Sequence, residues 1–221
     1  LAAAACVASL LFLIAGCDKD KKGVVPPAEL VDLKPTLAVQ KLWDTGVGGG
    51  GEKLRLALGL ALDSGVLYTA ARDGEVIALD PASGRAKWSQ DTKADLAAGP
   101  GVGASLVAVG TSDGKVIALD VASGKVLWKA SVSSEVLSAP LVTGDRVIVR
   151  SVDGRVHALD ALTGKSQWTG EEPVPKLSLR GTAPPVLAKD NVIAGFDSGK
   201  VIAFALATGD IVWQAQVTTP G

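Results

Sequence analysis

The sequence predicts an all-β fold, a β-propeller fragment of about four blades, each blade a four-stranded antiparallel sheet. Three observations predict it: a repeat of 40 to 45 residues, short β-rich runs separated by Asp-Gly or Ser-Gly turns, and a tryptophan at one place in every copy. The chain has 221 residues, of which 48% are hydrophobic and 20% charged, a composition typical of globular proteins.

The copies of the repeat align on their turns and on their tryptophans. They begin at the dipeptides Asp73-Gly74, Asp113-Gly114, Asp153-Gly154 and Ser198-Gly199, and end at Trp88, Trp128, Trp168 and Trp213. Trp43 ends a fifth, partial copy, so consecutive tryptophans are 45, 40, 40 and 45 residues apart. Because the repeat accounts for every tryptophan, we interpret all five as structural residues that fill gaps between stacked blades, not as an exposed binding platform.

Each copy contains four short strand signals. In the first copy, residues 66–71 form a β-rich run, Asp73-Gly74 suits a hairpin turn, and residues 76–79 form the next run. An Asp-x-x-Ser/Thr-Gly turn leads to the strand with the tryptophan, and runs such as residues 139–142, with an early proline, supply a fourth strand. Four antiparallel strands per copy describe a propeller blade. Four-bladed rings are rare, so we expect an open half-ring and a protein that continues beyond Gly221.

The first residues have the character of an export signal. Residues 1–16 are almost wholly apolar but too few to span a bilayer, and a charged stretch follows Cys17. The chain has no methionine and starts at Leu1, so we expect this signal to be truncated. A cysteine directly after small residues resembles the bacterial lipobox, which implies that Cys17 is lipidated and anchors the protein to a membrane. An ordinary signal peptide with an accidental cysteine is the alternative.

These observations divide the chain into three parts. Residues 1–16 are the signal peptide, residues 17–36 the lipidated N-terminus with a flexible, proline-containing linker, and residues 37–221 the partial propeller. Both cysteines, Cys6 and Cys17, lie in or beside the apolar run, which excludes a disulfide scaffold or a cysteine zinc site in the propeller.

No residue pattern indicates catalysis, a metal site or a cofactor. The single histidine, His157, occupies a position that is isoleucine in the other copies, so we interpret it as a packing residue. The aspartates recur with the blades, which favours turn capping over a catalytic pair. Gly48 to Gly51 lack the residues that follow a phosphate-binding loop, and we interpret them as a flexible loop. A net charge of -1 gives no reason to expect nucleic acid as a partner.

One segment breaks the repeat. The copy between Trp168 and Trp213 is five residues longer than its predecessor, and the stretch after Trp168 contains Leu177, Leu179 and Arg180. Paired apolar side chains beside an arginine have the composition of a protein-binding hot spot. The alternative is that these leucines fold back onto the blade.

The repeat resembles that of the quinoprotein propellers. Together with the lipobox and the segment Lys176-Leu177-Ser178-Leu179-Arg180-Gly181, it makes the chain similar to the BamB family of the outer-membrane β-barrel assembly machine. This resemblance covers essentially the whole chain. It implies an eight-bladed, non-enzymatic scaffold, lipid-anchored at the periplasmic face of the outer membrane, that promotes assembly and insertion of outer-membrane proteins.

The resemblance also implies partners and a site. In that family the Leu-x-Leu-Arg segment contacts BamA, so Leu177, Leu179 and Arg180 are expected to bind BamA within the barrel-assembly complex. The acidic residues that accompany this loop in the family are expected beyond Gly221. Unfolded outer-membrane proteins are a further candidate partner.

Three alternatives stay open at this point. Asp18, directly after Cys17, resembles an inner-membrane retention signal of some bacteria. A pyrroloquinoline-quinone dehydrogenase would share the repeat, but such enzymes use adjacent cysteines, calcium-binding acids and amides, and a catalytic aspartate, for which this propeller offers no pattern. An uncharacterised lipoprotein propeller with another periplasmic partner is the third.

Overall fold

The computed structural model describes residues 27–32, 34, 36–50, 56, 58–178 and 182–218. The chain divides into two compact units, residues 1–40 and residues 41–221. The described residues of the first unit form neither helix nor strand, and the predicted signal peptide and Cys17 lie outside the described part. Among the described residues, no helix has the length and apolar character needed to cross a membrane.

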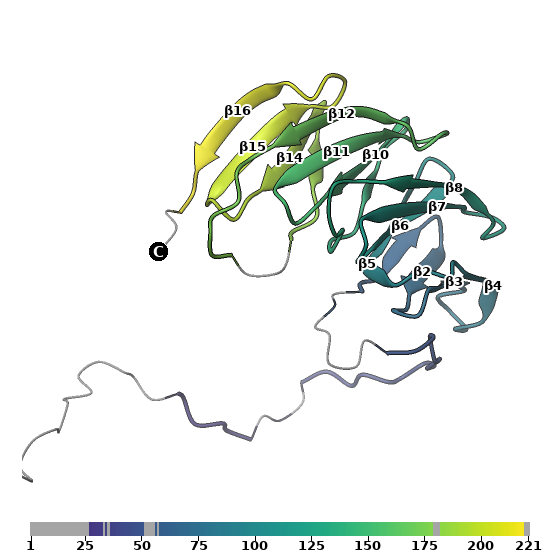
Figure 1. Cartoon of the computed structure of the whole chain (residues 1–221). Helices are drawn as coiled ribbons and strands as arrows, with labels where there is room; N and C mark the ends of the chain where they lie inside the picture. Colours follow the sequence, from purple (N-terminus) through teal and green to yellow (C-terminus); the bar gives the residue numbers. More distant parts are fainter. Residues whose placement is uncertain are drawn as a thin grey trace, which may run out of the picture. The chain divides into compact units, whose positions relative to one another are not determined.

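The described part of the second unit forms four antiparallel sheets of four strands, which we name blades 1 to 4 (Figure 1). Blade 1 consists of β1 (Ala61–Asp63), β2 (Val66–Ala70), β3 (Glu75–Leu79) and β4 (Ala86–Asp91). Blade 2 consists of β5 (Leu96–Gly103), β6 (Leu106–Thr111), β7 (Lys115–Asp120) and β8 (Val126–Ser131). Blade 3 consists of β9 (Leu141–Val142), β10 (Arg146–Arg150), β11 (Arg155–Asp160) and β12 (Ser166–Glu171). Blade 4 consists of β13 (Val186–Ala188), β14 (Asn191–Gly195), β15 (Lys200–Ala205) and β16 (Ile211–Gln216).

In every sheet, strands consecutive in the sequence are hydrogen-bonded neighbours, so each blade is a simple meander. Four such blades confirm the predicted all-β propeller fragment. The third strand of each blade is a nearly continuous run of apolar residues, and the packing of the blades explains this pattern. In β7, Val116 and Ile117 are both buried although their side chains leave opposite faces of the sheet, because blade 3 covers the Val116 face and blade 1 covers the Ile117 face.

One of the two sets of recurring aspartates, Asp80, Asp120 and Asp160 of blades 1 to 3, closes the turn between the third and fourth strands. Asp80 Oδ1 accepts hydrogen bonds from the Ser83 hydroxyl and the Ser83 amide, both at 2.8 Å. These bonds hold the pKa of the Asp80 carboxyl below its usual range. Asp120 and Asp160 make the same contacts with Ser123 and Thr163. Their interpretation as turn residues is therefore confirmed.

Tryptophans connect each blade to the next one along the chain. Trp88, Trp128 and Trp168 each donate their indole N–H to a backbone carbonyl of the following blade: Val121, Ala161 and Leu206, at 2.9–3.0 Å. Trp43 makes the same bond to Pro81 of blade 1. Each ring also lies on a glycine of the neighbouring turn; a Cβ on Gly164 would stand 2.6 Å from the Trp128 ring. That glycine has a φ of 71°, so its conformation and its crowding both favour the absence of a side chain.

Apolar side chains fill the rest of the space between blades. One cluster joins blades 1 and 2, a second joins blades 2 and 3, and a third joins blades 3 and 4. The third cluster combines Trp168 of blade 3 with Phe204 of blade 4, whose rings stack with centroids 6.1 Å apart. These clusters hold the blade edges, and the segments that leave them, in defined positions.

Candidate partner-binding site at the junction of blades 3 and 4

The non-repeating segment lies between β12 and β13 and presents Leu177 to solvent. The Leu177 side chain is 94% exposed, so the alternative in which the loop leucines fold back onto the blade does not hold for this residue. Leu179 and Arg180 lie outside the described residues. An exposed leucine on a segment that the repeat does not require is a candidate contact for another protein.

Two buried charged residues flank this segment. Arg150, at the end of β10, is 2% exposed, and Glu172, directly after β12, is 8% exposed. Neither residue was predicted as a site residue, although the repeat carries a signal for both. The positions equivalent to Arg150 hold Ala70, Gly110 and Gly195, and those equivalent to Glu172 hold Thr92, Val132 and Val217.

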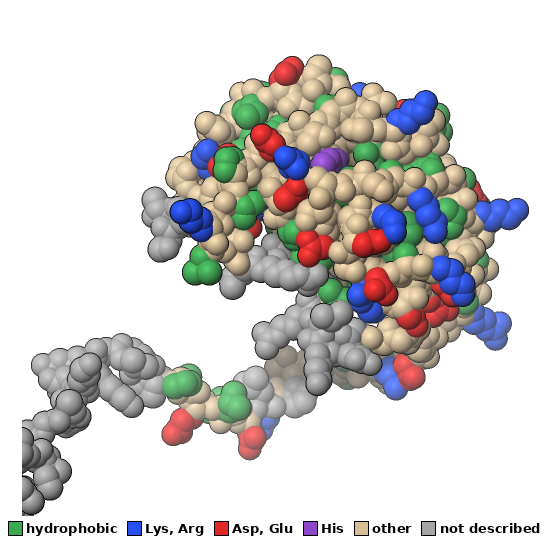
Figure 2. Space-filling model, viewed as in Figure 1, with side chains coloured by type: hydrophobic (Ala, Val, Ile, Leu, Met, Phe, Trp, Pro, Cys, Tyr) green, Lys and Arg blue, Asp and Glu red, His purple; other side chains and the backbone are tan. Residues whose placement is uncertain are grey.

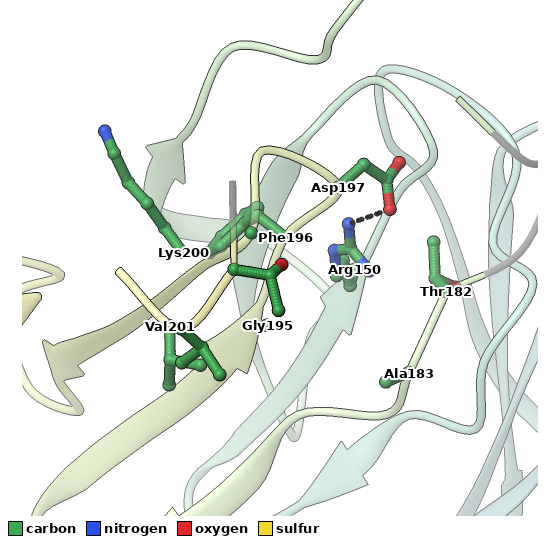
Figure 3. Close-up of a pocket in the computed structure, with 11 residues that line it drawn as sticks. Arg150, Thr182, Ala183, Gly195, Phe196, Asp197, Lys200 and Val201 are labelled. Carbon is green, nitrogen blue, oxygen red and sulfur yellow. Dashed lines mark ion pairs between the residues drawn. The ribbon is translucent and has the colours of Figure 1, made fainter. Parts of the chain in front are cut away.

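Arg150 reaches from blade 3 to the turn between β14 and β15 of blade 4 (Figure 3). Its Nη2 atom lies 3.6 Å from Asp197 Oδ1, and its guanidinium carbon lies 5.0 Å from the centroid of the Phe196 ring, a cation–π contact. Burial lowers the pKa of Arg150, and the Asp197 carboxylate opposes that shift. With Thr182 and Lys200, these residues line a cavity of about 330 Å³.

Glu172 is anchored to both blades. Its backbone amide donates to the Gly154 carbonyl of blade 3 at 3.0 Å. Its carboxylate oxygens lie 3.0 and 3.1 Å from Lys200 Nζ of blade 4. The Lys200 side chain extends away from Arg150, so the two ion pairs are separate (Figure 3). The segment therefore starts from a residue that is held on two blades.

His157 is buried in a small polar network in blade 3. Its Nε2 lies 3.0 Å from Ser133 Oγ and 3.1 Å from Ser151 Oγ, and its Nδ1 lies 3.3 Å from Thr169 Oγ1. Burial lowers its pKa; the Asp153 carboxylate opposes this shift and Arg155 adds to it. His157 is thus a hydrogen-bonded residue as well as the packing residue that we expected.

This lowered pKa predicts a pH effect. The unfolded chain, with a histidine pKa of about 6.5, binds more protons than the folded chain once the pH falls below that value. The contribution of His157 to stability is therefore complete above pH 6.5 and is lost as the pH falls toward the lower pKa of the folded state. We expect His157→Ile, which restores the residue of the other blades, to remove up to about 1.4 kcal/mol per pH unit of this slope.

Urea unfolding of both proteins at pH 7.5, 6.5, 6.0 and 5.5 measures the effect. Identical slopes for His157→Ile and the parent would contradict it.

Charged side chains of both signs are mixed on the face seen in Figure 2. Among the described residues, no group of three or more His, Cys, Asp or Glu side chains could hold a metal ion. Gly49 N donates to Asp73 Oδ2 at 2.5 Å, so a carboxylate occupies the place that an anion would take at a phosphate loop.

Comparisons with known proteins agree with this architecture. The family described as "Outer membrane protein assembly factor BamB" matches residues 39–98 and 72–221. The assembly factor BamB of Pseudomonas aeruginosa is 49% identical over 98% of this chain and 57% of its own length. That of Alkalilimnicola ehrlichii is 53% identical over 95% of this chain and 54% of its own length. The chain thus spans about half the length of the curated relatives it matches.

Solved structures give the same fold. The crystal structure of BamB from Moraxella catarrhalis superposes with a TM-score of 0.69 and 30% identity, covering 76% of this chain and 52% of that one. Quinohemoprotein alcohol dehydrogenase from Comamonas testosteroni superposes with a TM-score of 0.59 at 20% identity, over 73% of this chain and 35% of its own, a likeness of fold alone.

Blades joined by tryptophans, with a repeat like that of the quinoproteins, define a β-propeller of the quinoprotein repeat class. Within this class, the family match and the close relatives settle the assignment. The chain belongs to the family of outer membrane protein assembly factor BamB.

Proposed function

We propose that this chain is part of a non-enzymatic scaffold lipoprotein that binds BamA in the barrel-assembly complex and promotes assembly and insertion of outer-membrane proteins. The single observation that supports it best is the exposed Leu177, on the one segment that departs from the repeat, in a member of the BamB family. Leu179 and Arg180 complete the proposed contact by the matching family motif.

Exposure gives Leu177 a physical reason to bind. An exposed leucine gains about 1.5–3 kcal/mol when a partner buries it completely. Large contributions of this kind come from few residues at the centre of an interface, often with an arginine nearby. Leu177 and Arg180 together therefore have the residue composition that is typical of the centre of a small interface.

Location at the periplasmic face of the outer membrane, through a lipid on Cys17, is part of the same proposal. Acyl chains on one cysteine hold a protein at a membrane because each buried methylene contributes about 0.8 kcal/mol. Mass spectrometry of the mature N-terminus tests the anchor: a lipidated Cys17 supports it, and an unmodified cysteine would oppose it.

Replacing Leu177 with alanine in the full-length protein tests the binding site. We expect the affinity for BamA to fall about tenfold or more, because the loss of a hot-spot side chain costs about 1.4 kcal/mol or more. Leu179→Ala and Arg180→Ala are expected to act in the same direction. Co-purification and titration with the periplasmic part of BamA measure the effect.

Leu162→Ala is the matched control. Leu162 is 88% exposed, but it lies in the turn between β11 and β12, at the opposite end of β12 from the proposed site. This variant should bind BamA as the parent does. Equal affinities for the parent and for Leu177→Ala would remove the site assignment.

The enzyme alternative is tested separately. Adding pyrroloquinoline quinone and calcium to the full-length protein should produce no dye-linked alcohol oxidation. Oxidation of the alcohol under these conditions would replace the scaffold function by a dehydrogenase.

A further inference from the structure

We propose that two ion pairs, Arg150–Asp197 and Glu172–Lys200, each with one buried member, are positioning elements that fix the segment 173–178 relative to blade 4. What this segment binds rests on the proposed function; that the pairs hold it in place does not. The partner-binding segment would then be pre-arranged by charged residues of the propeller body.

The start of the segment contacts the turn between β14 and β15, and Thr182, which follows the segment in the chain, lines a cavity together with residues of that turn. The turn between β14 and β15, residues 196–199 followed by Lys200, contacts Glu172 directly before the segment through Lys200. It also contacts Arg150 through Asp197, in the cavity that Thr182 lines on the other flank. The chain that leaves blade 3 is therefore linked to blade 4 at its start by the Glu172–Lys200 ion pair. At Thr182 it runs beside the second ion pair, Arg150–Asp197, at the cavity (Figure 3).

Stability of the fold alone does not favour a charged residue at the positions of Arg150 and Glu172. At the equivalent places the other blades use small, apolar or hydroxyl residues, such as Gly110 for Arg150 and Val132 for Glu172. Moving a charge into the protein interior costs desolvation energy, and well-packed apolar residues of similar volume often stabilise as well or better. Ion pairs with a buried member can instead select one arrangement of the groups that they join.

Two details support a positioning role. Arg150 Nε and Nη2 have no hydrogen-bond partner in the described structure, so the guanidinium relies on Asp197 and Phe196 for its electrostatic compensation. Glu172 has both carboxylate oxygens within 3.1 Å of Lys200 Nζ. A loop held in this way loses less conformational freedom when a partner binds, and this raises affinity.

The junction of blades 1 and 2 offers a matched control. Arg72, beside the equivalent turn of blade 1, pairs with Asp95, which precedes β5, with Nη2 3.1 Å from Oδ2. This pair also joins two blades, but the Asp95 side chain is 70% exposed, and the pair is far along the chain from the segment 173–178. Its loss should leave that segment unaffected.

The test replaces a whole pair, so that no buried charge is left alone. In Glu172→Gln with Lys200→Gln, two amides can still form a hydrogen bond, but the ion pair is gone. The backbone NMR order parameters of residues 174 and 176–178 are measured in the free, full-length protein. We expect them to fall from about 0.85, typical of rigid backbone, to below about 0.6, because the segment becomes mobile without unfolding of the blades.

Arg72→Gln with Asp95→Asn is expected to leave the order parameters of these residues unchanged. Hydrogen exchange of the β11 amides reports in both variants whether the blades remain folded. If the first variant does not fold, Arg150→Gln with Asp197→Asn is measured in the same way, with the same expected decrease. Unchanged order parameters in a folded variant would overturn the positioning role.

BamA titration separates this inference from the proposed function. With both correct, Glu172→Gln/Lys200→Gln weakens BamA binding about tenfold, and Arg72→Gln/Asp95→Asn does not. If Leu177→Ala fails to weaken binding while the order parameters of 174 and 176–178 still fall in the pair variant, the proposed binding site is wrong and the positioning role of the ion pairs is supported.

Discussion

Replacing Trp128 with alanine is expected to lower the free energy of unfolding by about 3–5 kcal/mol, the usual cost of removing a large buried aromatic side chain. Trp128 is 9% exposed and packs between blades 2 and 3. The variant also leaves the Ala161 carbonyl without the indole N–H that lies 2.9 Å away. Urea unfolding followed by far-ultraviolet circular dichroism measures the change.

Trp213 provides the control at the same place in the repeat. It is 42% exposed, and its indole N–H has no hydrogen-bond partner among the described residues. Trp213→Ala is therefore expected to cost only about 1–2 kcal/mol in this chain. Equal losses for the two variants would show that packing onto the next blade is not the source of the Trp128 contribution.

Replacing Gly101 with alanine is expected to have the second large effect. Gly101 lies in β5 of blade 2, where a Cβ would stand 1.8 Å from the Pro140 carbonyl oxygen of the chain entering blade 3. The obstacle is backbone, so no side chain can rotate away and the two blades must separate. We expect a loss of about 3 kcal/mol or more, at the upper end of overpacking costs.

Gly144→Ala is the matched substitution without this obstacle. Gly144 lies in the turn before β10, has no atom within 4 Å of the added Cβ and does not have a positive φ. Its stability should change by no more than about 0.5 kcal/mol. A loss for Gly101→Ala no larger than that for Gly144→Ala would show that the blades separate there without cost.

The fold could be predicted because each blade repeats the same local signals. Asp73-Gly74 and the turn from Asp80 to Gly84 use residues whose conformational preferences act within a few positions of the chain. Trp88 and its equivalents then mark the outer strand of each copy. Such local signals need no knowledge of distant contacts, and the predicted blades agree with the observed ones.

The candidate site was only partly predictable. The break in the repeat pointed to Leu177, because a segment that no blade requires is visible in an alignment of the copies. The polar partners of His157, by contrast, come from residues 133, 151 and 169, and no spacing rule brings these together. The burial of Arg150 against Asp197 could not be predicted for the same reason, because the two residues lie on different blades. Its difference from the equivalent residues of the other copies was nevertheless visible in the sequence.

The sequence by itself determined the blade architecture, the tryptophan in every copy and the place where the repeat is interrupted, because these depend on local turn chemistry and periodic burial. Only the tertiary structure decided that Leu177 is exposed and that Arg150 and Glu172 are buried against Asp197 and Lys200. Burial and ion pairing depend on which residues of adjacent blades meet, and that is set by the packing of whole sheets. The interruption of the repeat is thus visible in the sequence. The ion pairs beside it, Arg150–Asp197 and Glu172–Lys200, form only where blades 3 and 4 pack together.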